Sequence, residues 1–269
     1  MIERKTINPK YREAVTELLF QLADDDFILS YRGSEWLGLA PHIEEDVAFS
    51  SISQDTMGHA AMFYQMLEEL GVGSADALAH ERSAKDRKNA VLVEFKNGTG
   101  HYMKLPKYDW AFAVVRNYFY VTAKYTKMKS LTNSSYAGLS NVSEKILMEL
   151  HYHVLHWKTW FYQLLTSNEE AKKRMNVAIE RVYQDLGGLF DLGKSSKEIV
   201  GFGLIEDEKI LIENWLKIVT PVLTSVSVLP PTKFVKTNGD GRNGEHTAEL
   251  IEAIEILSEV YNEDPFATW

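Results

Sequence analysis

The 269-residue sequence contains no cysteine and only seven prolines. The lack of cysteine excludes disulfides, iron–sulfur clusters and thiol catalysis. No apolar run approaches the roughly 18 residues of a membrane-spanning helix, and the N-terminus has no apolar signal region. Basic residues are also in the minority, with 29 Lys and Arg against 38 Asp and Glu, and the resulting net charge of −9 disfavours nucleic-acid binding. We therefore expect a cytoplasmic protein that binds neither nucleic acid nor a membrane.

The scarcity of proline leaves long segments in which apolar residues recur every three or four positions, a spacing that predicts helices. We expect an all-α fold, a four-helix bundle over about residues 10–166 with additional helices over 167–269, in a single domain 1–269. The four long helices are predicted at 10–37, 42–70, 109–131 and 143–165, and further helices at 168–192, 206–222 and 245–261. Residues 90–95 read as an extended piece, and Ser143 as the N-cap of the fourth helix.

Two of the long helices contain similar acid–histidine pairs. Asp55 precedes His59 by four residues, and Glu149 precedes His153 by four residues. This spacing places acid and imidazole on neighbouring turns of one helical face. Both histidines fall on apolar stripes of their helices, so we expect both imidazoles to point into the core.

Two positions between these acids and histidines determine whether the pattern forms a metal centre. In four-helix carboxylate-bridged di-metal proteins, two helices each supply Glu-x-x-His. The residues three before the histidines are here Thr56 and Leu150, and neither carries a carboxylate. The spacing therefore indicates a di-metal site without its central ligands. In a purely structural interpretation, each acid and the histidine that follows it form a buried hydrogen-bonded pair.

Other polar and aromatic groups have simpler explanations. The aspartates at 24–26 lie in mid-helix, and they form a solvated patch or a local break, or else one of them faces the bundle centre. The acids at 44–46 suit the positive end of a helix dipole. His151 and His156 are expected at the surface or rim. The many aromatic residues of 109–131 favour core or interface packing over a cofactor site.

Several short motifs in a specific order resemble those of a known family. They are Leu29-Ser30-Tyr31-Arg32 with Glu35-Trp36, Ala40-Pro41, Asp46 nine residues before Asp55, Val93-Glu94, Arg116-Asn117-Tyr118-Phe119, Glu149 with Tyr152-His153, and Gly244-Glu245-His246-Thr247. Over about residues 20–269 the sequence resembles the ferritin-like subunits of the bacterial multicomponent phenylacetyl-CoA 1,2-epoxidase. Within that family it resembles the PaaC type, which is related to the di-iron catalytic subunit PaaA.

The resemblance implies a degenerate metal site. Thr56 and Leu150 stand where the catalytic relative has bridging glutamates, and Val121 stands near a third-helix ligand. Asp26 still provides an acid near the first-helix position. The implied pocket, with no metal, cofactor or catalytic residue expected in this chain, is lined by Asp26, Asp55, Thr56, His59, Val121, Glu149, Leu150 and His153.

The resemblance also implies a role. We expect a structural, non-catalytic subunit that stabilises a PaaA-type catalytic subunit, with the di-iron centre in that partner and further oxygenase subunits in the complex. A homodimer is a further expectation for its assembly. The alternative is a metal-binding ferritin-like oxidoreductase with a rearranged mono- or di-metal site, for which Asp26, Asp55, His59, Glu149 and His153 supply oxygen and nitrogen donors. A third hypothesis is an unrelated helical scaffold with structural histidine pairs.

Overall fold

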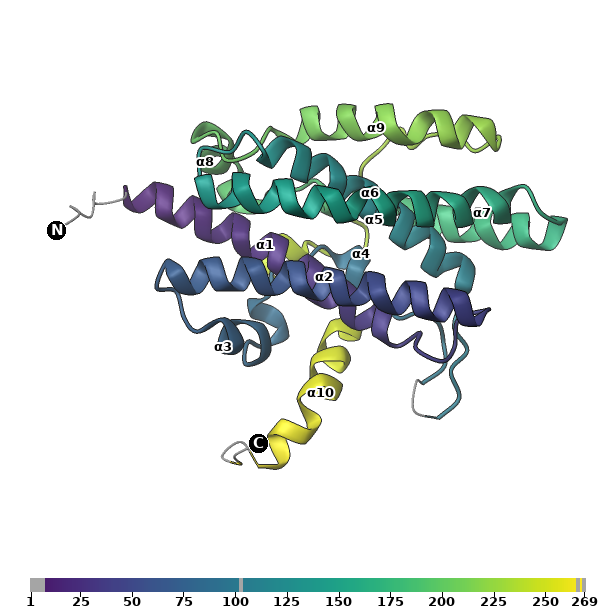
Figure 1. Cartoon of the computed structure of the whole chain (residues 1–269), viewed down its shortest axis with the longest axis horizontal. Coiled ribbons are helices and arrows are strands. Elements are labelled where there is room, and N and C mark those ends of the chain that lie inside the picture. Colours follow the sequence, from purple (N-terminus) through teal and green to yellow (C-terminus); the bar gives the residue numbers. More distant parts are fainter. Residues whose placement is uncertain (1–7, 102–103, 265–266, 268–269) are drawn as a thin grey trace.

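The computed structural model describes residues 8–101, 104–264 and 267, and this part of the chain is helical without any strand. Its four long helices are α1 (Pro9–Ser34), α2 (Ile43–Glu69), α5 (Trp110–Leu131) and α6 (Ala137–Leu165). Helix α1 packs along α2, and α5 packs along α6 (Figure 1). The structure thus confirms the predicted all-α bundle and is consistent with a ferritin-like arrangement.

The helix ends follow from local chemistry. Asn8 caps α1 because its side chain accepts a hydrogen bond from the Lys10 amide at 3.0 Å, and Asp109 caps α5 in the same way through the Phe112 amide at 3.1 Å. Gly71, with φ of +72°, allows the chain to turn after α2. The prediction of Ser143 as an N-cap is wrong, because Ser143 is buried within α6, which begins six residues earlier at Ala137.

The predicted extended piece at 90–95 is also wrong. Residues Val91–Glu94 form a buried helical turn, α4. Between α4 and α5, the described residues pair only in two isolated bridges, Gly98 with Tyr108 and His101 with Leu105. A run of apolar residues this short suits a buried helical turn as well as a strand, and periodicity cannot separate the two. Two further short α-helices are α3 (Ala75–His80), which precedes α4, and α8 (Ser196–Gly201), which lies in the C-terminal part.

The C-terminal part contributes α7 (Glu169–Tyr183), α9 (Glu208–Ser225) and α10 (Ala248–Glu263). The helix predicted at 168–192 therefore ends earlier than expected. The segment after Tyr183 packs closely on the backbone around Phe234. A Cβ atom at Gly187 would lie only 2.7 Å from the Phe234 backbone. This close approach requires glycine, and glycine does not favour a continuing helix.

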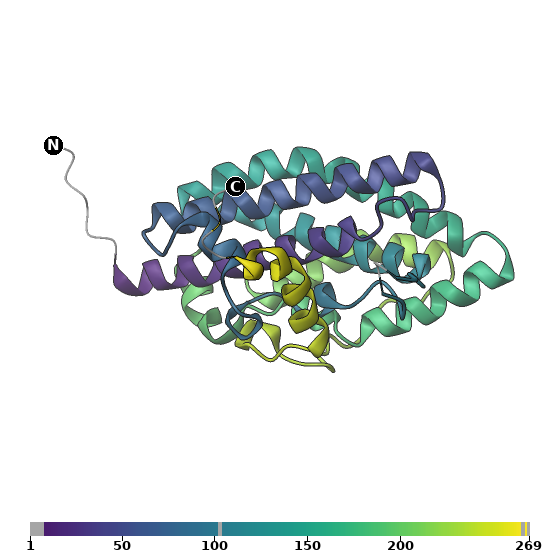
Figure 2. The same cartoon turned by 90° about the horizontal axis from the view of Figure 1, so that it is seen from below.

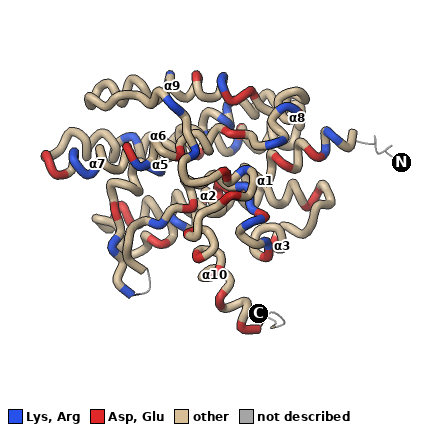
Figure 3. The backbone as a smooth tube through the Cα atoms, turned by 180° about the vertical axis from the view of Figure 1, so that it is seen from behind, with Lys and Arg blue, Asp and Glu red and all other residues tan. Residues whose placement is uncertain are grey.

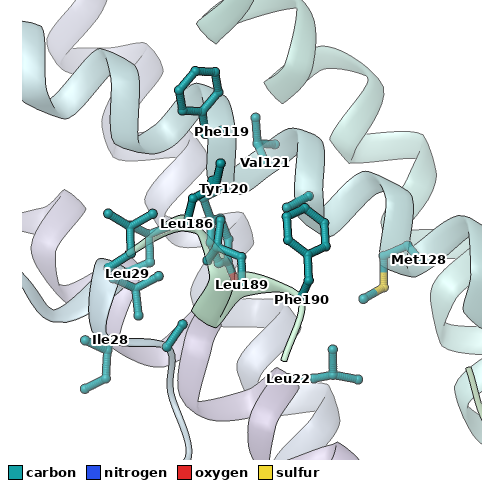
Figure 4. Packing of buried hydrophobic residues seen from close by; sticks show 14 of the residues in the cluster. Leu22, Ile28, Leu29, Phe119, Tyr120, Val121, Met128, Leu186, Leu189 and Phe190 are labelled. Atoms are coloured by element: carbon teal, nitrogen blue, oxygen red, sulfur yellow. The ribbon is translucent and has the colours of Figure 1, made fainter. Parts of the chain in front are cut away.

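These additional segments complete the core of the bundle. Side chains of Leu186, Leu189 and Phe190 lie among those of α1 and α5 (Figure 4). Trp215 of α9 donates a hydrogen bond of 2.8 Å to Thr122 of α5. Helix α10 instead projects from the body of the molecule (Figure 1; Figure 2 shows it from below), and it contains acidic residues but no Lys or Arg of its own (Figure 3).

The aromatic residues of α5 belong to this core. Phe112, Tyr118 and Phe119 are fully buried within the chain, and Phe119 packs against Phe161 of α6 and Trp215 of α9. Of the two roles that the sequence left open for these residues, the structure supports core packing. Any partner surface must therefore lie on other helices.

A lysine-centred pocket as candidate functional site

The two histidines of the predicted site point into the bundle from neighbouring helices. His59 of α2 is 1% exposed and His153 of α6 is 4% exposed, and their ring centroids lie 6.4 Å apart. The prediction that both imidazoles face the core is confirmed. The apolar stripes around them explain this placement, because burial of each stripe carries its histidine inward.

The hydrogen-bonded pairs cross between the helices. Nε2 of His59 lies 2.6 Å from Oε2 of Glu149, and Nε2 of His153 lies 3.0 Å from Oδ2 of Asp55. The predicted pairing of each acid with the histidine of its own helix is therefore wrong. The acids lie about one residue, or about 100°, round the helix from the inward position, so they reach across to the facing helix. Their side chains stay 40% and 46% exposed, for Asp55 and Glu149 respectively.

The centre of the pocket is occupied by a residue that the sequence analysis did not select, Lys124 of α5. Its Nζ atom lies 2.8 Å from both carboxylate oxygens of Asp26 and 2.8 Å from Nδ1 of His59. Tyr120, one turn earlier on α5, donates a 2.5 Å hydrogen bond to Asp26. A signal was present in the sequence, because Lys124 lies one turn after Val121, the position that the resemblance assigned to a ligand.

The ammonium group fixes the proton positions around it. An ammonium only donates, so Nδ1 of His59 accepts from Lys124, and the ring proton lies on Nε2 and is donated to Glu149. Burial lowers the pKa of His59 far below its ordinary value, and Lys124 and His153 lower it further. Burial also lowers the pKa of Lys124 and raises that of Asp26, although each charge opposes the shift of the other.

The remaining predicted positions cannot ligate a metal ion. Thr56 uses its hydroxyl within α2, donating to the Ile52 carbonyl at 2.7 Å, while Val121 and Leu150 are buried hydrocarbon side chains. Among the described residues, no group of three or more His, Cys, Asp or Glu could hold a metal ion. The donor set does not fit a carboxylate-bridged di-iron centre, which needs several carboxylates, because Thr56, Val121 and Leu150 stand at the positions where the resemblance expects carboxylate ligands.

Asp26 is the last of the three consecutive aspartates, and all three are buried in an unbroken α1. The expectations of a solvated patch and of a helix break are both wrong, and all three side chains point inward instead of one. Asp24 accepts hydrogen bonds from Arg82, from the Tyr64 hydroxyl at 2.5 Å and from the Lys88 amide at 2.8 Å. These contacts explain how the helix tolerates a buried acid at this position.

Asp25 connects α1 to the end of the chain. Arg242 donates to both of its oxygens, at 2.9 and 2.7 Å, and the Ala90 amide donates to it at 2.7 Å. Lys127 lies 3.6 Å away. A guanidinium matches a carboxylate with two parallel hydrogen bonds, which fixes the relative orientation of the two segments. Asp25 therefore ties α1 both to the segment before α4 and to the loop before α10.

A second set of polar contacts joins α2 and α6 near the start of α2. Glu45 is buried and accepts hydrogen bonds from His156 at 2.8 Å and from the indole of Trp160. The helix dipole alone does not explain this acid, which also accepts hydrogen bonds from two half-buried donors. His156 is half-buried at this contact, in agreement with its predicted rim position.

The family motifs meet in space although they lie far apart in the sequence. His246 lies 2.8 Å from the buried carboxylate of Glu94, which also accepts from the Thr247 amide at 2.6 Å and from Asn89 at 2.8 Å. Arg32 donates to the Glu94 carbonyl at 2.9 Å. Three of the motifs that carry the resemblance, those containing Arg32, Glu94 and His246-Thr247, thus meet in one hydrogen-bonded network around α4.

This arrangement defines a helical bundle with a buried polar pocket formed by Asp26, His59 and Lys124. A family model described as "Phenylacetic acid catabolic protein" matches residues 1–269, and the chain belongs to this family. The chain is similar to the PaaC-type component of the 1,2-phenylacetyl-CoA epoxidase of Escherichia coli (strain K12). The two are 26% identical over 249 residues, which cover 91% of this chain and 96% of the relative. The resemblance inferred from the motifs is confirmed.

Proposed function

We propose that the chain is a structural, non-catalytic subunit of a multicomponent phenylacetyl-CoA epoxidase and that it stabilises a PaaA-type catalytic subunit. The observation that carries this proposal is the ammonium of Lys124 between Asp26 and His59. A chain of this family with a lysine at the centre of the pocket lacks the ligands for a di-iron centre. The proposal therefore places the metal and the oxygen chemistry in the partner.

The exposed side of α6 is the surface on which this partner would dock. Its apolar residues recur at heptad spacing and form a stripe that no described segment covers: Met148, Tyr152, Leu155 and Tyr162. Helix α2 adds the exposed Ile43 and Val47 near the end where Glu45 contacts α6. We call these six residues the α2/α6 surface. Exposed apolar residues on two neighbouring helices are typical of an obligate interface between helical subunits.

The two crossed histidine pairs reach solvent between α2 and α6. Asp55 and Glu149 are the half-exposed ends of the two crossed histidine pairs. Burial raises the pKa of Glu149, and the charge of Asp55 adds to that effect. A partner on the α2/α6 surface would cover both carboxylates, and it would then have to offer them hydrogen-bond donors.

Co-expression with a PaaA-type chain tests the proposal. We expect the tagged chain to retain the partner through purification and to raise the yield of soluble partner. The chain alone should neither hold iron nor oxidise phenylacetyl-CoA. Failure of the partner to co-purify, or oxidation by the chain alone, would contradict the proposal. One metal ion per wild-type chain, lost on His59→Ala, would support the alternative of a metal-binding oxidoreductase.

A charge placed on the α2/α6 surface tests the location of the interface. Tyr152 is 70% exposed, and Tyr152→Glu should weaken partner binding at least about tenfold without changing the circular dichroism spectrum. Val177→Glu is the matched control, because Val177 is 60% exposed on α7, away from this surface. Equal losses in both variants would argue against the proposed surface. Self-association of the chain, abolished by Tyr152→Glu, would identify a second copy as the occupant.

A further inference from the structure

The ammonium of Lys124 lies close to three atoms that can donate electron pairs to a metal ion. Its 2.8 Å distances run to two oxygens of Asp26 and to Nδ1 of His59. All three atoms lie at this distance from Nζ, but only Oδ1 of Asp26 and Nδ1 of His59 form a hydrogen bond with it, and the buried Oδ2 has no hydrogen-bond partner among the described residues. Metal–ligand distances for these atoms are about 2.0–2.2 Å, so the donors would need to close by less than about 1 Å around a metal ion.

The side chains of His59 and Asp26 make hydrogen bonds like those that orient the ligands in metal sites. The proton on Nε2 of His59 is donated to Glu149, and metal-binding histidines usually donate their second N–H to a carboxylate or carbonyl. Tyr120 donates to Asp26 and orients its carboxylate from a second direction. These contacts hold the donors in place independently of Lys124.

The pocket is closed to solvent and has little free volume. Lys124, Asp26 and His59 are each at most 5% exposed. A cavity of about 10 Å³, lined in part by Asp26, Tyr120, Lys124 and Leu189, lies beside Asp26 and Lys124, with room for about one water molecule. The space for a metal ion with a water ligand is thus taken up by the lysine side chain.

We propose that Lys124 is a built-in cation that takes the place of a metal ion, and that its removal opens a site for one divalent ion of the zinc or cobalt class on Asp26 and His59. In this proposal Lys124 alone prevents binding of a single ion, while Thr56, Val121 and Leu150 account for the loss of a di-iron centre. The proposal concerns the pocket and is independent of the partner, so it stands or fails separately from the proposed function.

The test uses Co²⁺ because its absorption bands report nitrogen and oxygen ligation. Lys124→Glu replaces the ammonium by a third donor, and we expect this variant to bind one Co²⁺ per chain at least about 100-fold more tightly than wild type. Lys124→Met keeps the stem but adds no donor, so we expect intermediate affinity from removal of the charge alone. Lys129→Glu is the matched control, since Lys129 is exposed on the same helix, and it should behave as wild type.

Second substitutions locate the ion. Lys124→Glu combined with His59→Ala, or with Asp26→Asn, should lose the Co²⁺ absorption bands. If Lys124→Glu is unfolded without metal, added Co²⁺ should restore its helical circular dichroism, because an ion that binds the folded state stabilises it. The proposal is overturned if wild type binds Co²⁺ as tightly as Lys124→Glu, or if the ion survives both second substitutions. It is also overturned if neither Lys124→Glu nor Lys124→Met gains affinity.

Discussion

Asp24 and Asp25 differ from their neighbour Asp26, although all three are buried on one helix. Asp24 and Asp25 bind arginine side chains and backbone amides from other segments, whereas Asp26 binds an ammonium and a phenol. Burial alone would raise the pKa of Asp24, but Arg82 and Arg87 hold it below its ordinary value. Burial keeps the pKa of Asp26 raised in spite of Lys124.

The contacts of Asp24 and Asp25 fix the positions of segments, whereas the contacts of Asp26 constrain the geometry of the pocket less. A guanidinium with paired hydrogen bonds fixes two segments in one geometry, while an ammonium is a compact charge that makes few directional demands. We therefore expect loss of an arginine contact to destabilise the fold strongly. Changes around Asp26 should have smaller effects on stability and larger effects on the chemistry of the pocket.

The largest effect is expected for Arg242→Ala. It leaves the carboxylate of Asp25 buried without its guanidinium, and removal of one partner of a buried pair costs about 3–5 kcal/mol. Urea unfolding followed by circular dichroism measures this loss. Arg174→Ala, which breaks an exposed ion pair on α7, is the control and should leave the unfolding midpoint unchanged. A loss below about 1 kcal/mol for Arg242→Ala would show that the arginine contact of Asp25 does not stabilise the fold strongly.

Acid should destabilise the protein through the histidines of the pocket. Burial lowers the pKa values of His59 and His153 in the folded state, so each takes up a proton less readily in the fold than in the unfolded chain, where histidines become protonated below about pH 6.5. The unfolded state then binds more protons, and stability falls as the pH falls. Between pH 6.5 and 5 we expect a loss of about 1.6 kcal/mol for each histidine that stays neutral.

Unfolding experiments at several pH values measure this slope. His59→Gln should show a weaker loss of stability over the same range, because one of the two titrating groups is absent. The same slope in wild type and variant would show that His59 is protonated in the folded protein, contrary to its position beside Lys124.

A moderate effect is expected for Tyr120→Phe. The variant removes the hydroxyl that donates to Asp26, and a hydrogen bond to a charged group contributes about 2 kcal/mol. It should also raise the pKa of Asp26 further, because that bond favours the ionised form. Tyr118→Phe on the same helix changes no contact to an aspartate and serves as the control. Equal effects of the two variants would show that Tyr120 contributes only by packing.

The smallest effect is expected for the crossed histidine pairs. A double-mutant cycle between His59→Ala and Glu149→Ala should give a coupling energy of about 0.5 kcal/mol, because Glu149 is partly exposed. The corresponding cycle between His59→Ala and Asp55→Ala should give a value near zero. A larger coupling in the second cycle would restore the pairing within one helix that the sequence had suggested.

The sequence predicted the long helices well, because α2 and α6 bury periodic apolar stripes and no proline interrupts α1 or α5. It also predicted that His59 and His153 point inward, for the same reason. The partners of these histidines depend on how α2 is rotated relative to α6, and a spacing within one helix carries no information on that rotation. Lys124 was missed, and Asp24 and Asp25 were not expected in the core beside Asp26, because charged residues are rarely buried and only their mutual contacts make burial possible.

The contact between Asp25 and Arg242 joins residues 217 positions apart. As a ribosome releases the chain from its N-terminus, Asp25 emerges long before the arginine that neutralises it. Until then, burial of α1 would leave this carboxylate without its main counter-ion, which disfavours early docking of the helix. Contacts of such high sequence separation also slow folding, because a long loop must close before they form. The bundle therefore reaches its final packing only after Arg242 has left the ribosome.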